Sequence, residues 1–141
     1  MAETIRQVTY YKVMVPNRMG EGARLLGALH NAGINLLAFS GFPAGKKAQF
    51  DFIPEDAPAF ERAAKGAGIK AGAGKEVFLV QGEDRIGALA DIFVKLAAAK
   101  VSITALDGIA AGMSRYGAIF WVQPKDVAKA VRAVRIGPGV F

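Results

Sequence analysis

Apolar positions recur along the chain with two alternating periods, one typical of strands and the other typical of helices. Residues 8–15 are apolar, aromatic and β-branched, which predicts a strand. In residues 19–32 three leucines return at helical spacing, which predicts an amphipathic helix. The first half then continues with a strand at 34–39, a loop at 41–47, a strand around Phe50 and Phe52, a helix capped by Asp56, and a short strand around Ile69.

The second half of the chain predicts the same order of elements. Each half therefore reads βαββαβ, so we expect an α+β fold of two tandem ferredoxin-like units, each an antiparallel sheet with both helices on one face. The elements predicted in the second half are a strand at 76–80, a helix beginning at Ile86, a strand at 101–106, a loop at 108–112, a strand at 116–122, a helix opened by Pro124 and Asp126, and a last strand at 135–141.

The two halves also repeat each other in sequence. A shift of 67 residues places residues 13–41 on residues 80–108 without a gap, and 8 of the 29 aligned positions are identical. A repeat of this length indicates two copies of one structural unit, so we predict domains at residues 1–72 and 73–141. The identical positions include the pairs Arg18 and Arg85, Gly20 and Gly87, and Gly41 and Gly108.

Composition narrows the class of protein. Apolar residues make up 52% of the chain and the net charge is +6, with no cysteine. A chain without cysteine has no disulfide, no catalytic thiol and no thiolate metal site. No apolar run approaches the ~20 residues of a membrane span, and the N-terminus lacks the apolar core of a signal peptide. A cytoplasmic location is therefore expected, with no membrane partner.

The turn between the first strand and the first helix of each half carries the most informative residues. It reads PNRMG at 16–20 and EDRIG at 83–87. The glycine lets the backbone approach a ligand closely. The helix behind it offers free N–H groups and a partial positive charge, which suit a carboxylate. Asn17 and Asp84 could also cap these helices without any ligand.

In each half of the chain a strand is followed by an (N/D)-R-(M/I)-G turn, then by a helix with paired aliphatic residues, and then by a strand that opens with Ile34-Asn35 or Val101-Ser102. In this order of its elements, each half resembles the ACT domain. The resemblance covers nearly the whole chain, as two tandem copies. ACT domains are small βαββαβ modules that sense amino acids in metabolic enzymes and regulators. In members that bind a ligand, the ligand lies between two units packed edge to edge. The first turn of one unit and the start of the second strand of its neighbour contact it.

Carried onto this chain, the resemblance implies an amino-acid ligand, and no cofactor is expected. A metal site is not expected either, because His30 is the only histidine and no cysteine accompanies it. A regulatory protein of this kind is expected to pass its ligand-bound state to a partner enzyme or regulator. We also expect a homodimer, because the aromatic strands at 50–52 and 120–121 exceed what such thin units usually bury. The turn residues implied as ligand contacts are Asn17, Arg18, Met19 and Gly20, with Asp84, Arg85, Ile86 and Gly87 in the second copy, and the strand residues are Asn35 and Leu36, with Ser102 and Ile103.

The two copies differ from each other, and from the family, at these positions. Met19 and Ile86 stand where the family often has proline. The first turn has Asn17, which donates and accepts hydrogen bonds, whereas an ionised Asp84 only accepts them and repels a carboxylate. We therefore expect the first turn to bind an amino acid more tightly than the second turn.

Two other classes of function are alternatives to an amino-acid sensor. No set of residues has the pattern of a catalytic site, so we predict that the chain is not an enzyme. RNA-recognition domains share the βαββαβ order and a basic charge, but they carry an RNP1-like stretch with exposed aromatics. The strands AQFDFI at 48–53 and GAIFWV at 117–122 do not match it. A nucleic-acid partner is therefore not expected, and the third class is an assembly module without a ligand.

Overall fold

The computed structural model describes residues 3–134, and the contacts divide the chain into two compact units. Residues 9–75 form one of them, which we call the continuous unit. The other unit, which we call the composite unit, joins residues 3–8 to residues 76–134. The predicted domains at 1–72 and 73–141 differ from these units mainly in the place of residues 3–8, which lie with the second half of the chain.

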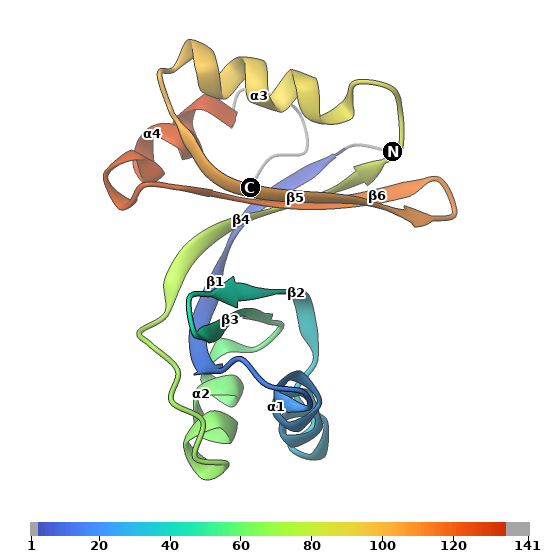
Figure 1. Ribbon diagram of the computed structural model, residues 1–141. Coiled ribbons are helices and arrows are strands. Elements are labelled where there is room, and N and C mark those ends of the chain that lie inside the picture. The colour runs from blue at the N-terminus through green and yellow to red at the C-terminus, as the bar shows by residue number, and fades with distance from the viewer. Residues whose placement is uncertain (1–2, 135–141) are drawn as a thin grey trace. The chain divides into compact units, whose positions relative to one another are not determined.

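The continuous unit has a sheet in the order β2-β3-β1, with antiparallel pairing at both contacts. Helices α1 and α2 lie together on one face of this sheet (Figure 1). The strand expected around Ile69 is reduced to an isolated bridge between Val13 and Ala71. The elements are β1 (Thr4–Pro16, of which residues 9–16 belong here), α1 (Glu21–Asn31), β2 (Leu36–Ala44), β3 (Lys47–Pro54) and α2 (Ala57–Gly66).

The composite unit has a sheet in the order β1-β4-β6-β5, and α3 and α4 lie on one of its faces (Figure 1). Thr4 Oγ1 donates to Gln81 O at 3.4 Å and Gln7 Nε2 donates to Glu76 Oε1 at 2.9 Å, so β1 and β4 run antiparallel. The strand predicted at 135–141 lies outside the described residues. The further elements are β4 (Lys75–Glu83), α3 (Ala88–Ala98), β5 (Ile103–Gly112), β6 (Arg115–Val122), the 3-10 turn η1 (Pro124–Asp126) and α4 (Val127–Val134).

Each unit has its own apolar core between the sheet and the helices, as the one-sided apolar stripes of the helices predict. The expected α+β fold of two βαββαβ-type units is confirmed in this respect. Burial of each large side chain stabilises the fold by ~1.5–3 kcal/mol. The core of the continuous unit contains Tyr11, Val13, Val15, Leu25, Leu29, Phe52 and Phe60, and that of the composite unit contains Ile5, Phe78, Val80, Ile92, Leu96, Phe120 and Val134.

Several predicted details are confirmed and others are wrong. Asp56 caps α2 as predicted, since its Oδ1 accepts a hydrogen bond from the Ala59 N–H at 3.1 Å. The loop expected at 41–47 is largely strand, because β2 continues to Ala44 and pairs with β3 along its whole length. Of the aromatic residues expected to form an association surface, Phe52 and Phe120 are core residues instead, at 0% and 1% exposed.

The repeat extends to irregularities of the backbone. The pairing shifts between Leu36 and Ala38 in β2, and at the equivalent place between Ile103 and Ala105 in β5. A second shift in β5, before Gly112, accommodates one extra residue and twists the strand locally. The equivalent positions are therefore 67 residues apart before this bulge and 68 apart after it.

Candidate functional site

The turn that precedes the first helix of each unit has the same backbone geometry in both copies. Gly20 has φ +89° and Gly87 has φ +76°, and each stands immediately before its helix. A Cβ at either glycine would meet no atom within 4 Å, so the left-handed conformation, not a lack of space, favours glycine here. Neither helix receives a hydrogen bond from a side-chain cap, so the alternative in which Asn17 and Asp84 serve only to cap the helices is not observed.

Hydrogen bonds of the main chain fix both turns to the adjacent hairpin. The Asn17 N–H donates to Lys46 O at 3.4 Å, and the Asp84 N–H donates to Ser114 O at 2.8 Å. The Arg18 N–H donates to Pro16 O at 2.9 Å and is therefore not available to a ligand. Among the described residues, no acceptor is found for the N–H groups of Met19, Gly20, Ile86 and Gly87, which leaves these four for a ligand or water.

The side chains of Met19 and Ile86 are fully exposed, at 101% each. The sequence pattern predicts a helix that begins at Ile86. The helix begins at Ala88 instead, and the left-handed Gly87 separates Ile86 from the buried stripe. Both residues can therefore offer backbone groups to a ligand while their side chains remain at the surface.

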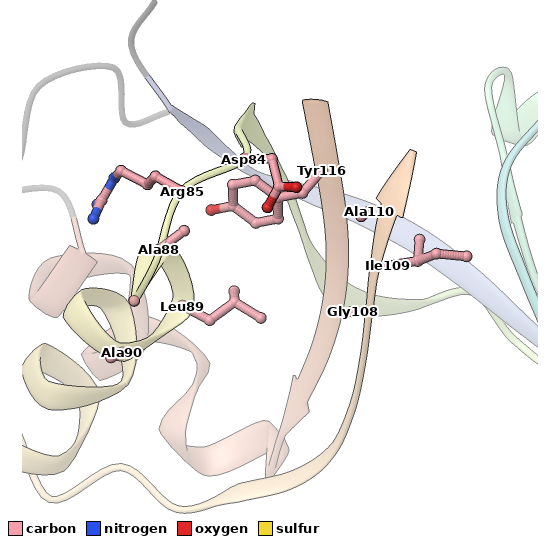
Figure 2. A pocket seen from close by; sticks show the side chains of 10 residues that line it. Asp84, Arg85, Ala88, Leu89, Ala90, Gly108, Ile109, Ala110 and Tyr116 are labelled. Atoms are coloured by element: carbon pink, nitrogen blue, oxygen red, sulfur yellow. The ribbon is translucent and has the colours of Figure 1, made fainter. Parts of the chain in front are cut away.

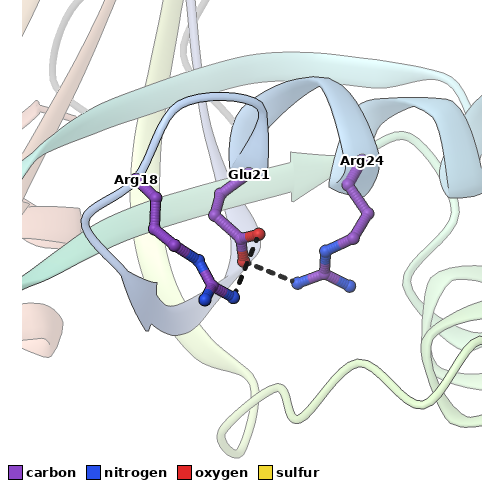
Figure 3. A network of polar contacts seen from close by, with 3 residues as sticks. All are labelled: Arg18, Glu21 and Arg24. Atoms are coloured by element: carbon purple, nitrogen blue, oxygen red, sulfur yellow. Dashed lines mark hydrogen bonds and ion pairs between the residues drawn. The ribbon is translucent and has the colours of Figure 1, made fainter.

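Each turn arginine pairs with a carboxylate of the following helix, but the carboxylate comes from a different position in each copy. Glu21 lies 3.8 Å from Arg18 and 3.0 Å from Arg24 (Figure 3). The hydrogen bond from Arg24 holds the pKa of the Glu21 carboxyl below its usual value. In the second copy Arg85 pairs with Asp91 at 2.8 Å. Asp91 stands where the first copy has Arg24.

These exchanges give the two turns opposite charge. Arg18, Glu21 and Arg24 leave the first turn with one net positive charge. In the second turn Asp84, Arg85 and Asp91 together carry one net negative charge, without counting Glu83 of the same turn. The side-chain charges therefore favour an anionic group at the first turn and a cationic group at the second, although both turns offer free backbone N–H groups.

A pocket of about 330 Å³ lies beside the second turn, within the composite unit (Figure 2). The turn, the first residues of α3 and the second half of β5 form its walls. Among the described residues, no hydrogen bond or ion pair reaches the carboxylate of Asp84, which lies at the rim beside Tyr116. The lining residues are Asp84, Arg85, Gly87, Ala88, Leu89, Ala90, Gly108, Ile109, Ala110 and Tyr116.

Tyr116 connects this pocket to the N-terminal strand. Its phenol donates a hydrogen bond to the carboxylate of Glu3, while its ring lines the pocket. Burial and this hydrogen bond raise the pKa of the Tyr116 phenol, so it stays protonated and continues to donate at neutral pH.

The corresponding place in the continuous unit is filled differently. A Cβ on Gly41 would lie 2.7 Å from ring atoms of Phe50, and one on Gly22 would lie 3.5 Å from the same ring. In the composite unit the equivalent positions are Gly108, Ala118 and Leu89. The bulky side chain thus comes from the strand in one unit and from the helix in the other.

The structure does not bring the predicted strand residues to the turn of their own unit. Leu36 pairs with Pro54, whereas the turn follows Pro16, which pairs with Lys47 at the other end of β3. Ile103 pairs with Val122, likewise at the far end of β6 from Asp84. Asn35 Nδ2 donates to Glu55 Oε2 at 3.2 Å, and Ser102 is exposed. A site that combines turn and strand therefore needs a neighbouring unit and stays a prediction.

Sequence reasoning did not identify the part of the pocket that comes from β5 and β6. Gly108, Ile109, Ala110 and Tyr116 had been assigned to a loop and a strand without a role in binding. One signal was present, because Gly108 is identical to Gly41 in the repeat, and a glycine inside a strand often marks a close approach.

Within the described part of the chain, no group of three or more histidine or acidic residues is arranged to hold a metal ion. None of the helices at residues 3–134 is long and apolar enough to cross a membrane.

No model of a protein family matches this sequence, and no curated protein matches it. Its fold is similar to protein BT0572 from Bacteroides thetaiotaomicron, with 17% identity, 94% of this chain and 89% of that chain covered, and a TM-score of 0.80. It is also similar to the ligand-free regulatory subunit of aspartate kinase from Thermus thermophilus, with 18% identity, 96% of both chains covered, and a TM-score of 0.63. At these identities the likeness establishes the fold.

A third structure with this fold is E. coli aspartokinase III in complex with aspartate and ADP. Its identity to this chain is 15% and its TM-score is 0.54. The match covers 96% of this chain but 32% of that one. The same two-unit architecture therefore occurs both as a separate subunit and inside a larger enzyme.

Proposed function

We propose that this chain is a cytoplasmic regulatory protein that binds an amino acid, has no catalytic activity of its own, and transmits the bound state to a partner enzyme or regulator. The observation that carries the proposal is the pair of glycine turns, which have the same left-handed geometry and leave backbone N–H groups without an acceptor. The likeness in fold to regulatory subunits of aspartate kinase supports it.

The ligand's α-carboxylate is expected at the first turn. The N–H groups of Met19 and Gly20 are available there, the start of α1 adds a partial positive charge, and the local net charge is positive. The Arg18 N–H is excluded from this role because Pro16 O already accepts it. Arg18 contributes through its charge instead.

The other polar groups of the ligand are expected to meet Asn17 and, from a neighbouring unit, Asn35. Removal of one buried hydrogen-bonding partner typically costs ~1–3 kcal/mol. Asn35→Ala is therefore expected to weaken binding roughly tenfold or more, although it also removes the hydrogen bond to Glu55. Unchanged affinity in both Asn17→Ala and Asn35→Ala would remove these residues from the site.

A neighbouring unit can be supplied by a second copy of the chain. Strand β2 pairs only with β3, and strand β5 pairs only with β6, so each has one unpaired side among the described residues. Both strands also carry exposed apolar side chains. Phe42 is 46% exposed and Ile109 is 72% exposed. Pairing of such strands between two copies would cover these residues and bring the start of one strand near a turn of the other copy. Leu36 of β2 and Ile103 of β5, where the pairing of each strand shifts, would then line the shared site together with Ser102.

The nucleic-acid alternative is not favoured by the described residues. RNA-binding sheets stack bases on exposed aromatics of their central strands. Here Phe52 and Phe78, which lie on central strands, are 0% and 1% exposed. They belong to the core and offer no surface to a base.

Thermal unfolding in the presence of each proteinogenic amino acid tests the proposal. A ligand at about 100 times its dissociation constant adds ~2.7 kcal/mol to the stability, which raises the melting temperature by several degrees. A variant with Gly20→Val and Gly87→Val serves as the control, because valine is strained at both positions. If no amino acid stabilises the wild type more than this variant, the proposed function is wrong.

A further inference from the structure

We propose that the pocket beside the second turn is a separate binding site for a small primary ammonium compound with a short, branched aliphatic body. This inference deepens the proposed function, because it assigns a ligand class to one turn, but it needs only the composite unit. The site expected between neighbouring units does not include Gly108 or Tyr116.

The charges at the rim favour a cation. The Arg85 side chain extends away from Asp84 and Tyr116 in Figure 2, and its guanidinium is paired with Asp91 at 2.8 Å. The positive charge near the pocket is therefore already compensated. Asp84 has no such partner among the described residues. An ammonium group that approaches its carboxylate would form a charge-assisted hydrogen bond, which is stronger than a neutral one.

Tyr116 adds to the preference for a cation. Its phenol proton is committed to Glu3, so a ligand meets the face of the ring and not a free donor. The face of an aromatic ring attracts cations, and the carboxylate of Glu3 lies just behind the phenol. A carboxylate ligand would meet two acidic side chains, Asp84 and Glu3, and among the described residues the only positive groups to oppose them would be the backbone N–H groups at the start of α3.

The remaining walls favour an aliphatic body of limited size. Leu89 of α3 faces Gly108 of β5 across the pocket, and alanines line much of the rest, whereas the Ile109 side chain points away from the pocket (Figure 2). The volume of about 330 Å³ lies at the lower end of the range for ligand pockets, ~300–1,000 Å³. A short branched chain with one charged end matches this volume and polarity.

Titration of the whole chain with three probes, followed by amide NMR and calorimetry, tests the assignment. The probes are isobutylamine, isobutyrate and L-valine, which share a branched body but differ in charge. We expect isobutylamine to shift the signals of Gly87 and Gly108, and isobutyrate to leave them unchanged. If isobutyrate binds as tightly as the amine, or if isobutylamine does not bind, the inference is wrong.

Two variants locate the site. Asp84→Asn gives the second turn the side chain that the first turn already carries, so the fold should persist, and the affinity for isobutylamine should fall at least tenfold. Ala90→Leu enlarges a side chain of the pocket wall. Its matched control is Ala23→Leu, at the equivalent exposed position of the first copy, where binding of the amine should be unaffected. Wild-type affinity for the amine in both Asp84→Asn and Ala90→Leu would overturn the inference.

L-Valine separates this inference from the proposed function. Suppose that L-valine binds and shifts the amide signal of Gly20, while Ala90→Leu leaves the affinity for isobutylamine unchanged. The proposed amino-acid binding is then supported and the pocket assignment is wrong. If isobutylamine binds at the pocket while no amino acid stabilises the protein, the pocket is real and the proposed function fails.

Discussion

Gly22 and Phe50 of the continuous unit correspond to Leu89 and Ala118 of the composite unit, and the two pairs place a similar amount of bulk over an equivalent glycine. The Phe50 ring also stacks on Phe39, with the ring centroids 5.5 Å apart. Such compensating exchanges keep the core filled, because cores tolerate substitutions that conserve total volume. They leave Gly41 beneath a rigid ring and Gly108 beneath a flexible side chain.

Gly41→Ala and Gly108→Ala are therefore expected to differ in stability. The new Cβ at Gly41 would lie 2.7 Å from the Phe50 ring, whereas the one at Gly108 would lie 3.1 Å from the Leu89 methyl group, which can move. Overpacking typically costs ~1–3 kcal/mol, and we expect Gly41→Ala at the upper end and Gly108→Ala at or below the lower end. Urea unfolding measures both, and equal losses would contradict the packing described.

Tyr11 provides a second prediction at this scale. Burial, with the hydrogen bond to Glu61, raises the pKa of the Tyr11 phenol from 10.0 to about 12. As the pH rises above 10, the unfolded chain ionises this group before the folded chain does. Stability from the neutral phenol is therefore complete below pH 10 and is lost as the pH rises to about 12. Tyr11→Phe should be less stable at neutral pH and should lose part of this alkaline dependence.

Phenolate absorbance is the measurement for Tyr11. The folded wild type should show little tyrosine ionisation near pH 10, because the pKa values of Tyr10 and Tyr116 are raised as well. If all three tyrosines titrate near pH 10 while the protein is still folded, the buried environment assigned to them is wrong.

At the scale of elements, β1 is the feature that links the two units. Its first residues form the edge of the composite sheet beside β4, and its later residues form the edge of the continuous sheet. Ile5 is 4% exposed and belongs to the core of the composite unit, although more than 70 residues of chain separate it from Phe78. The composite unit therefore depends on the N-terminal residues.

We expect Ile5→Ala to destabilise the composite unit by ~2–5 kcal/mol, as is typical for loss of a buried isoleucine. Hydrogen exchange followed by mass spectrometry should show faster exchange at residues 76–134 and little change at residues 17–66. Val13→Ala is the matched control, because Val13 lies on the same strand but in the core of the continuous unit. Its effect should appear in the other unit, and faster exchange in the same segments for both variants would contradict the division.

Periodicity was sufficient for the helices and for most strands, since α1, α2 and α3 fall where the apolar stripes predict. It was insufficient for the start of β1, because residues 4–7, which are polar except for Ile5, become strand only through pairing with β4. It also missed the ends of β2 and β5, where glycines suggested loops. Pairing with β3 and β6 holds these segments extended, and sequence patterns carry no information on such distant partners.

The candidate site was predictable only in part, for the same reason. The turn glycines could be identified, because a helix preceded by glycine in a repeated motif has a local cause. The sequence could not predict which N–H groups are available to a ligand. The hydrogen bond from the Arg18 N–H to Pro16 O, for example, depends on the exact conformation of the turn. The pocket could not be found either, because it combines the second turn with β5 and Tyr116, which only the folded sheet brings together.

At the scale of the whole molecule, the repeat has produced two turns with the same backbone and opposite local charge. The first turn suits a carboxylate and the second suits an ammonium, so the chain is expected to recognise the two ends of an amino acid or amine unequally. Gly20→Val should therefore reduce amino-acid affinity more than Gly87→Val, whereas the order should reverse for isobutylamine. Equal losses for both ligands would contradict a functional difference between the turns.

The central claim is that the glycine turns bind the ligand, and hydrogen exchange with and without the most stabilising amino acid tests it most directly. Bound ligand would occupy the N–H groups of Met19 and Gly20, or of Ile86 and Gly87, which otherwise lack an acceptor. The account predicts slower exchange in peptides that cover residues 17–23 or 84–90, and no change in α2 or α4. Slower exchange confined to α2 and α4, with both turns unaffected, would contradict it.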